Sequence, residues 1–173
     1  MADGPQTLQL RLDSRGATRR LGRRLAACLA PGALLVLAGD RGAGKTVLVR
    51  AIGRGLGVST DIRITSPTFD LVHELPGRIP LVHADLYRLD DPSTLVELGL
   101  SEHIGRESVV VIEWGERFRQ ELGPDGVTIR LDLDADGRRC RLEAEGPAGQ
   151  ALLGRLMEAL RERPIAGRSD RPA

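Results

Sequence analysis

The chain has 173 residues, a length that suits one domain with a sizeable core. An apolar fraction of 41% and a charged fraction of 28% are ordinary for globular proteins, and they exclude disordered and membrane-spanning compositions. The net charge of +1 argues against a protein that binds nucleic acid through a strongly basic surface. Among the 25 basic side chains, Lys45 is the single lysine.

The charges are unevenly distributed along the chain. Residues 1–69 carry 11 basic and 4 acidic side chains, a net charge of +7, whereas residues 70–116 carry 3 and 10, a net charge of −7. A basic first third followed by an acidic middle suits anion binding followed by metal or proton chemistry. Solvated helix faces produce the same pattern, so the segregation alone leaves both interpretations open.

The sequence also carries information on the compartment. No apolar run is long enough for a signal peptide or a membrane span, so we expect a cytoplasmic protein without membrane association. Cys28 and Cys140 lie far apart without paired spacing, which favours two small core residues over a disulfide or a zinc site. Because aromatic residues make up 2% of the chain, the core is expected to be aliphatic.

Apolar periodicity predicts alternating strands and helices in the first third of the chain. Ser14 and Thr18 each suit the start of the earlier helix, and Pro31 ends it. The predicted elements are, in order, a strand over 7–12, a helix with Leu21, Leu25, Cys28 and Leu29 on its apolar face, a buried strand over 33–38 and a helix over 45–56.

The remaining chain predicts two hairpins, a central strand and a closing helix. The hairpin turns are Pro76-Gly77 and Asp136-Gly137, both typical turn sequences. The predicted elements are strands over 62–75 and 79–89, a short helix over 92–98, a central strand over 109–114 buried on both faces, strands over 127–134 and 138–145, and an amphipathic helix over 148–161.

These elements predict an α/β fold with three layers. Its central sheet is expected to be largely parallel, with antiparallel strands added by the later hairpins. We assign residues 1–163 to one domain, which the motif GDRGAGKT at residues 39–46 marks as a P-loop NTPase domain, and residues 164–173 to a disordered C-terminal tail.

Residues 39–46 match the GxxxxGK[ST] phosphate-binding loop, or P-loop. Its glycines let backbone N–H groups turn inward around phosphate oxygens, because no Cβ obstructs them. Lys45 is expected to place its charge at the β- and γ-phosphates, and Thr46 its hydroxyl on Mg²⁺. The candidate nucleotide-binding residues are Gly39, Asp40, Arg41, Gly42, Ala43, Gly44, Lys45 and Thr46.

A P-loop enzyme also needs a carboxylate at the end of a neighbouring strand to hold the metal. Glu113 and Asp85 each close a predicted apolar strand. We expect Glu113 to be the closer metal partner and Asp85 to orient water or support the metal site from behind. Thr68, in the loop that follows the P-loop helix, is a candidate sensor of the γ-phosphate, with a proline-fixed strand bulge as the alternative. His83 alternates with Asp85 on one strand face, which makes it the best candidate among the three histidines.

The segments GDRGAGKT, ITSPTFDLVHEL, HADLYRL and VVVIEWGE, in this order, resemble the bacterial TsaE (YjeE) family over residues 8–161. That family comprises the small ATPase subunit of the machinery that makes threonylcarbamoyladenosine next to the anticodon of tRNA. The resemblance implies Mg²⁺-dependent ATP hydrolysis in a complex with TsaB and TsaD homologues. It also implies that a partner subunit transfers the threonylcarbamoyl group, so that tRNA is engaged indirectly through the complex.

The resemblance further assigns roles to individual positions. It implies ATP on the P-loop, Mg²⁺ on Thr46 and Glu113, and Asp85 and Thr68 in the hydrolytic and switch region. Trp114 matches the tryptophan beside the family's metal carboxylate. Weaker correspondences near the nucleotide base are Ser14 or Thr18 and Gly137 or Arg138, and the chain departs from the usual pattern at Arg41 and Val47.

Two other functions fit a P-loop in a chain of this size. A small-molecule kinase would need an arginine-rich lid over the phosphates, and no compact segment of that kind lies between the later strands. A non-catalytic nucleotide-gated binding module is the second alternative. The basic stretch 11–24 fits tRNA, an acidic partner or a plain exposed helix face.

Overall fold

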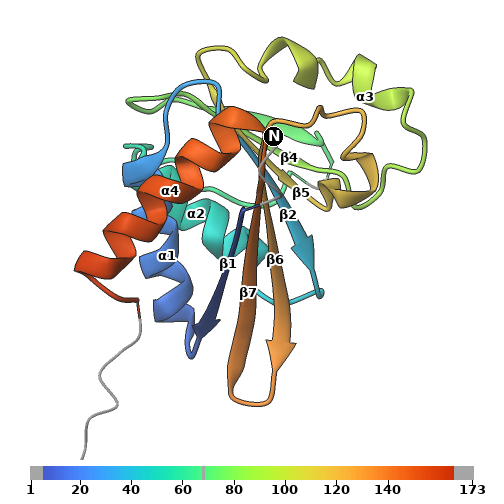
Figure 1. Ribbon diagram of the computed structural model, residues 1–173. Helices are drawn as coiled ribbons and strands as arrows, with labels where there is room; N and C mark the ends of the chain where they lie inside the picture. The colour runs from blue at the N-terminus through green and yellow to red at the C-terminus, as the bar shows by residue number, and fades with distance from the viewer. Residues whose placement is uncertain (1–5, 68, 166–173) are drawn as a thin grey trace, which may run out of the picture.

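A mixed sheet of seven strands forms the centre of the molecule (Figure 1). The structure is a computed structural model and describes residues 6–67 and 69–165. The strand order across the sheet is β1-β7-β6-β2-β5-β4-β3. The strands are β1 (Gln6–Leu12), β2 (Leu34–Gly39), β3 (Val72–Leu75), β4 (Leu81–Asp85), β5 (Val109–Glu113), β6 (Gly126–Asp134) and β7 (Gly137–Glu145).

The sheet is less parallel than the sequence predicted. The pairings β6–β2, β2–β5 and β5–β4 are parallel, whereas β1–β7, β7–β6 and β4–β3 are antiparallel. The predicted hairpins at Pro76-Gly77 and Asp136-Gly137 are confirmed, and each adds an antiparallel strand to a parallel centre. The third antiparallel pairing, between β1 and β7, forms because β1 joins the outer edge of β7. This pairing joins distant segments of the chain, and no local sequence pattern reveals it.

Helices cover the sheet on both faces. The long helices α1 (Arg15–Cys28), α2 (Lys45–Gly55) and α4 (Gly146–Glu162) gather on one side of the strands, and the short helix α3 (Thr94–Glu97) lies on the other (Figure 1). Two 3₁₀ helices, η1 (Leu100–Glu102) and η2 (Gly115–Phe118), belong to the second side. Alternate residues of β2 serve the two cores: Leu35 and Leu37 pack under the long helices, and Leu34 and Val36 pack under the short ones.

Two strands are shorter in the structure than the sequence predicts. Of the segment 62–75 only β3 is a strand, and of the segment 79–89 only β4 is. Pro67 has no N–H to donate to a strand ladder, and Ile64 is buried against α2 instead of pairing in a sheet. The chain turns directly after Asp85, where the N–H of Leu89 donates to the carbonyl of Leu86 at 3.1 Å.

Ser14, not Thr18, begins the first helix. The Ser14 side chain accepts a hydrogen bond from the N–H of Ala17 at 3.1 Å, which satisfies one of the free amides of the first turn. Thr18 lies inside α1, and its side chain is buried. Of the two predicted starts, Ser14 is therefore confirmed and Thr18 is wrong.

The core is aliphatic, as its composition predicts. Among the described residues, Phe118 is the one buried aromatic side chain. Cys28 and Cys140 are both free and buried, which confirms their prediction as small core residues, and burial raises the pKa of the Cys140 thiol to about 12. Within the described part of the chain, no helix combines the length and apolarity that a membrane span requires. The segment 166–173 of the predicted tail lies outside the described residues.

Candidate functional site

The P-loop connects the end of β2 to the start of α2. Gly39, Gly42 and Gly44 have φ angles of 103°, 79° and 109°, in the region that only glycine adopts without strain. Gly39 also lies against β6, so that a Cβ at this position would collide with the backbone carbonyl of Leu131. The glycines therefore allow the turn itself, and at Gly39 a close approach to the neighbouring strand as well.

The substitution Gly39→Ala is expected to lower the free energy of unfolding by about 3 kcal/mol, because it adds a backbone collision to an unfavourable positive φ. In a chain of this size the melting temperature should fall by roughly 6–12 °C. Gly42→Ala is the matched control, since it has a positive φ but no atom within 4 Å of a Cβ, and should cost about 1–2 kcal/mol. Thermal and urea unfolding measure both, and equal losses would contradict the role of the close approach.

The Lys45 ammonium is buried at the mouth of the P-loop. Its Nζ donates to the backbone carbonyls of Gly39 at 2.8 Å and Asp40 at 2.7 Å, and it lies 3.7 Å from the centre of the Trp114 ring. The side chain is 5% exposed, and burial lowers the pKa of Lys45. Nearby carboxylates, with Glu113 first, oppose that shift. A cation is thus held at the loop despite its desolvation cost.

Thr46 and Glu113 meet directly behind the loop. The Thr46 hydroxyl lies 3.0 Å from both carboxylate oxygens of Glu113. His83 reaches the same carboxylate from β4, with Nε2 2.9 Å from Glu113 Oε1, and its ring is fully buried. Within the described residues, His83 Nδ1 has no hydrogen-bond partner.

Asp85 lies beside Glu113 at the carboxyl ends of β4 and β5. The two residues are paired in the strand register, so both carboxylates lie on the P-loop edge of the sheet. Ser66 donates a hydrogen bond to Asp85 Oδ2, and the backbone N–H of Tyr87 donates to Oδ1 at 3.0 Å. These two donors fix the plane of the carboxylate, which is buried.

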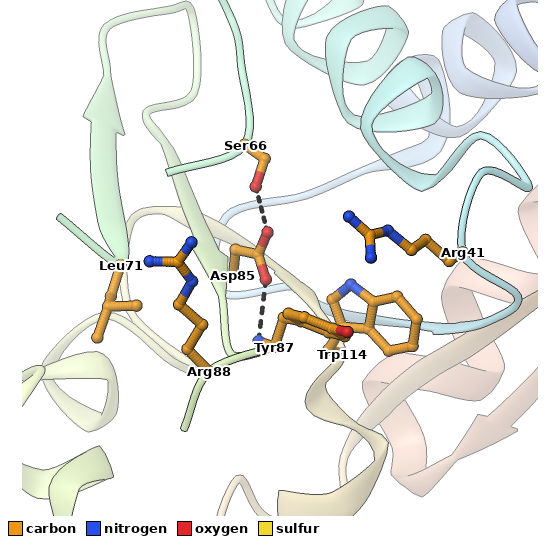
Figure 2. A pocket seen from close by; sticks show the side chains of 7 residues that line it. All are labelled: Arg41, Ser66, Leu71, Asp85, Tyr87, Arg88 and Trp114. Carbon is orange, nitrogen blue, oxygen red and sulfur yellow. Dashed lines mark hydrogen bonds between the residues drawn. The ribbon is translucent and has the colours of Figure 1, made fainter. Parts of the chain in front are cut away.

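A cavity of about 220 Å³ lies over Asp85. Figure 2 shows Arg41 of the P-loop and Arg88 approaching Asp85 from opposite sides, with Tyr87 and Trp114 below Arg41. The Tyr87 and Trp114 rings are 5.0 Å apart, and the Arg41 guanidinium lies 5.8 Å from the centre of the Tyr87 ring. The cavity combines two cations with a carboxylate beside the phosphate-binding loop.

Further contacts connect the P-loop to the β6–β7 hairpin. Asp40 Oδ2 accepts a hydrogen bond from the N–H of Leu133 at 2.9 Å, and Arg138 Nε donates to the carbonyl of Ala43 at 2.5 Å. Thr18 of α1 also lies close to Gly44. Thus Thr18 and Arg138, both predicted near the nucleotide, lie next to the loop, whereas Thr68 lies outside the described residues.

Sequence reasoning missed part of this site. Tyr87 and Arg88 line the cavity, and the segment LYRL directly after Asp85 is the sequence signal that points to them. Trp114 adopts a φ of 61°, an unusual value for a non-glycine residue, and this turn directs its ring over Lys45. No sequence pattern announces that conformation.

The donor set suits a magnesium nucleotide. The Thr46 hydroxyl and the Glu113 carboxylate, whose oxygens are 3.0 Å apart, are the hard oxygen ligands that Mg²⁺ prefers. In such sites Mg²⁺ keeps some of its waters and takes its remaining ligands from phosphates. Among the described residues no group of three or more His, Cys, Asp or Glu side chains forms a separate metal centre. The strand, glycine loop, helix and facing carboxylate define an α/β protein of the P-loop class.

Comparison with known proteins narrows that class to a family. Residues 12–141 match the family described as "Threonylcarbamoyl adenosine biosynthesis protein TsaE". A relative from Treponema pallidum, named tRNA threonylcarbamoyladenosine biosynthesis protein TsaE, is 42% identical over 132 residues, which are 75% of this chain and 96% of the relative. A Streptomyces coelicolor protein of the same name is 44% identical over 118 residues, covering 66% and 78% of the two chains. The chain belongs to the TsaE family.

A solved structure supports the same assignment. The crystal structure of Bacillus subtilis YdiB superposes with a TM-score of 0.78 at 28% identity, and the match covers 91% of this chain and 99% of YdiB. The resemblance that the motifs predicted is therefore confirmed at the level of family and fold.

Proposed function

We propose that this protein binds ATP and hydrolyses it to ADP and phosphate in a Mg²⁺-dependent reaction. The observation that carries the proposal is the contact between Thr46 and Glu113 next to the buried Lys45 ammonium. A hydroxyl, a carboxylate and a buried cation at the N-terminus of a helix together suit the charge of a magnesium nucleotide.

In this proposal the P-loop amides and Lys45 bind the phosphates. Lys45 lies at the amino end of α2, so its charge adds to the positive end of the helix dipole. Charge on the phosphate oxygens increases as the terminal phosphate departs, and preorganised donors stabilise it without reorganisation. Residues 39–46 would all contact the nucleotide, with Thr18 and Arg138 near its base.

Thr46 and Glu113 would hold Mg²⁺, which when bound neutralises charge on the β- and γ-phosphate oxygens. His83 keeps the Glu113 carboxylate in place through the contact at 2.9 Å. Asp85, fixed by Ser66 and the Tyr87 amide, would orient the attacking water, because it is the second carboxylate at this edge. Thr68 would sense the γ-phosphate from the adjacent loop.

The reaction would serve the synthesis of threonylcarbamoyladenosine in tRNA. The relatives from Treponema pallidum and Streptomyces coelicolor carry names that state this role. Within the assembly, TsaB and TsaD homologues would be the partners, and the transfer of the threonylcarbamoyl group would belong to a partner subunit. ATP hydrolysis by this chain would then supply the conformational work of the complex in the cytoplasm.

A phosphate-release assay tests the proposal. The chain is assayed alone, with TsaB and TsaD homologues, and with these partners plus tRNA. We expect turnover that depends on Mg²⁺, disappears with a chelator and rises strongly with the partners. Transfer of labelled γ-phosphate to a small-molecule acceptor would identify a kinase instead. Unchanged turnover after substitution of Thr68, Asp85 and Glu113 in turn would identify a nucleotide-gated module.

A further inference from the structure

Two helices that pack unusually closely carry most of the basic residues of the first third of the chain. Gly22 of α1 faces Ala51 of α2, and Gly55 of α2 faces Ala26 of α1, and at both glycines a Cβ would collide with the opposing side chain. The small residues let the two helix axes approach, so their outer faces merge into one surface.

That surface, which we call the arginine strip, contains no acidic side chain from either helix. α1 and α2 together carry seven arginines and no Asp or Glu. Two adjoining hollows, with volumes of about 470 and 270 Å³, lie along the strip. Arg19 and Arg23 border both of them. The members of the strip are the six arginines that line these hollows, Arg19, Arg20, Arg23, Arg24, Arg50 and Arg54.

The charge of the strip is not neutralised within the described residues. None of its arginines forms an ion pair there, although Arg11, Arg139 and Arg141 on the β1–β7 surface each do. Arg19 and Arg23 are exposed and make no hydrogen bond to any residue between 6 and 67 or 69 and 165.

We infer that the arginine strip binds the phosphate backbone of structured RNA. Arg19 and Arg23 are about one helical turn apart, a rise of roughly 6 Å along the axis of α1 between their backbone positions, and both border the same two hollows. Arg50 of α2, whose Nε donates to the carbonyl of Ile64 at 3.0 Å, borders the same hollow as these two, so both helices contribute charge to the strip. Guanidinium groups bind phosphate oxygens through two parallel hydrogen bonds, which a planar fork favours.

The composition of the strip distinguishes between kinds of RNA contact. Val47 and Ala51 line the hollow of about 270 Å³ together with arginines. None of its lining residues is aromatic, so it has no ring on which an unpaired base could stack. The exposed Tyr87 lies at the cavity over Asp85 instead. A surface of arginines without aromatic residues reads backbone charge and shape, as proteins that bind double-helical RNA do.

The strip adjoins the nucleotide site, because α2 begins at Lys45 and Thr18 of α1 lies close to Gly44 of the glycine loop. The choice of tRNA as the RNA rests on the proposed function, in which the chain serves a tRNA modification. A direct contact of this kind goes beyond the indirect engagement of tRNA that the family resemblance implies.

The test measures binding of a fluorescein-labelled, unmodified tRNA transcript to the full chain by anisotropy, from about 50 to about 200 mM salt. The variant Arg19→Gln/Arg23→Gln/Arg50→Gln removes three charges from the strip and keeps good helix formers. Its matched control, Arg11→Gln/Arg139→Gln/Arg141→Gln, removes three charges that are already paired with carboxylates. ATP affinity and thermal stability are measured for every variant.

We expect the strip variant to bind the tRNA at least about tenfold more weakly and to lower the salt slope of the binding constant by about three, with little effect in the control. Equal losses in both variants, or no binding by the natural chain, would overturn the inference. Displacement of the tRNA by polyglutamate as effectively as by unlabelled tRNA would overturn it in favour of an acidic protein partner. If the natural chain bound tRNA but did not bind ATP, the proposed function alone would be refuted.

Discussion

Replacement of Lys45 by methionine should reduce ATP affinity by at least about 100-fold, since two or more charge-assisted hydrogen bonds to phosphate are worth about 3 kcal/mol together. Isothermal titration with ATP measures the loss. Methionine fills a similar volume, so the variant removes the ammonium and keeps the packing beneath the Trp114 ring.

The same variant should be at least as stable as the natural chain. Burial lowers the pKa of Lys45, which means that the folded state disfavours its charged form relative to the unfolded state. At a pH below the lowered pKa of Lys45, the folded state bears the full cost of holding the charged ammonium. The methionine variant has no charge and does not bear this cost. Lys45→Arg is the charge control and should also bind ATP weakly, because a planar guanidinium cannot occupy the space of an ammonium. Unimpaired ATP binding by Lys45→Met would refute the P-loop assignment.

Replacement of Glu113 by glutamine should reduce ATP turnover by about 100- to 1,000-fold and weaken Mg²⁺ binding in the presence of ATP. The neutral amide keeps the size of the carboxylate but loses the charge that would hold the metal. Affinity for ATP measured with a chelator present should change little, since Lys45 and the loop amides remain. Phosphate release with the partner proteins, together with Mg²⁺ titrations, provides the measurements.

Asp85→Asn is the matched control for Glu113→Gln. It makes the same chemical change on the adjacent strand, at the paired register position. If Asp85 orients water, the variant should turn ATP over slowly at saturating Mg²⁺ while its Mg²⁺ dependence stays near that of the natural chain. A shift of the Mg²⁺ dependence by Asp85→Asn and not by Glu113→Gln would exchange the proposed roles of the two carboxylates.

The sequence predicted those parts of the site that depend on short spacings. The glycines, Lys45 and Thr46 are neighbours in the chain, so the strand–loop–helix unit could be recognised from eight residues. Glu113 could be assigned to the loop edge because it closes a buried parallel strand, and its contact with Thr46 agrees with that expectation. The order of the four parallel strands then places Asp85 beside it.

Other features depend on contacts between distant segments and could not be predicted. Gly39 approaches Leu131, and Asp40 accepts from Leu133, because β6 joins β2 at a register that no local pattern encodes. Ile64 lies in the segment 62–75 that the sequence predicted as a strand, but its apolar side chain packs against Gly53 of α2. Periodicity shows which side chains are buried, and it does not show which element buries them.

The burial of Lys45 has a consequence for chemical labelling. Apart from the terminal amine, this chain offers one primary amine, and its lowered pKa increases the share of neutral, nucleophilic amine at any pH near neutrality. An acylating reagent therefore meets one internal target, the Lys45 amine at the mouth of the P-loop. The rate of acylation would report directly on occupancy of the phosphate site, without any engineered probe.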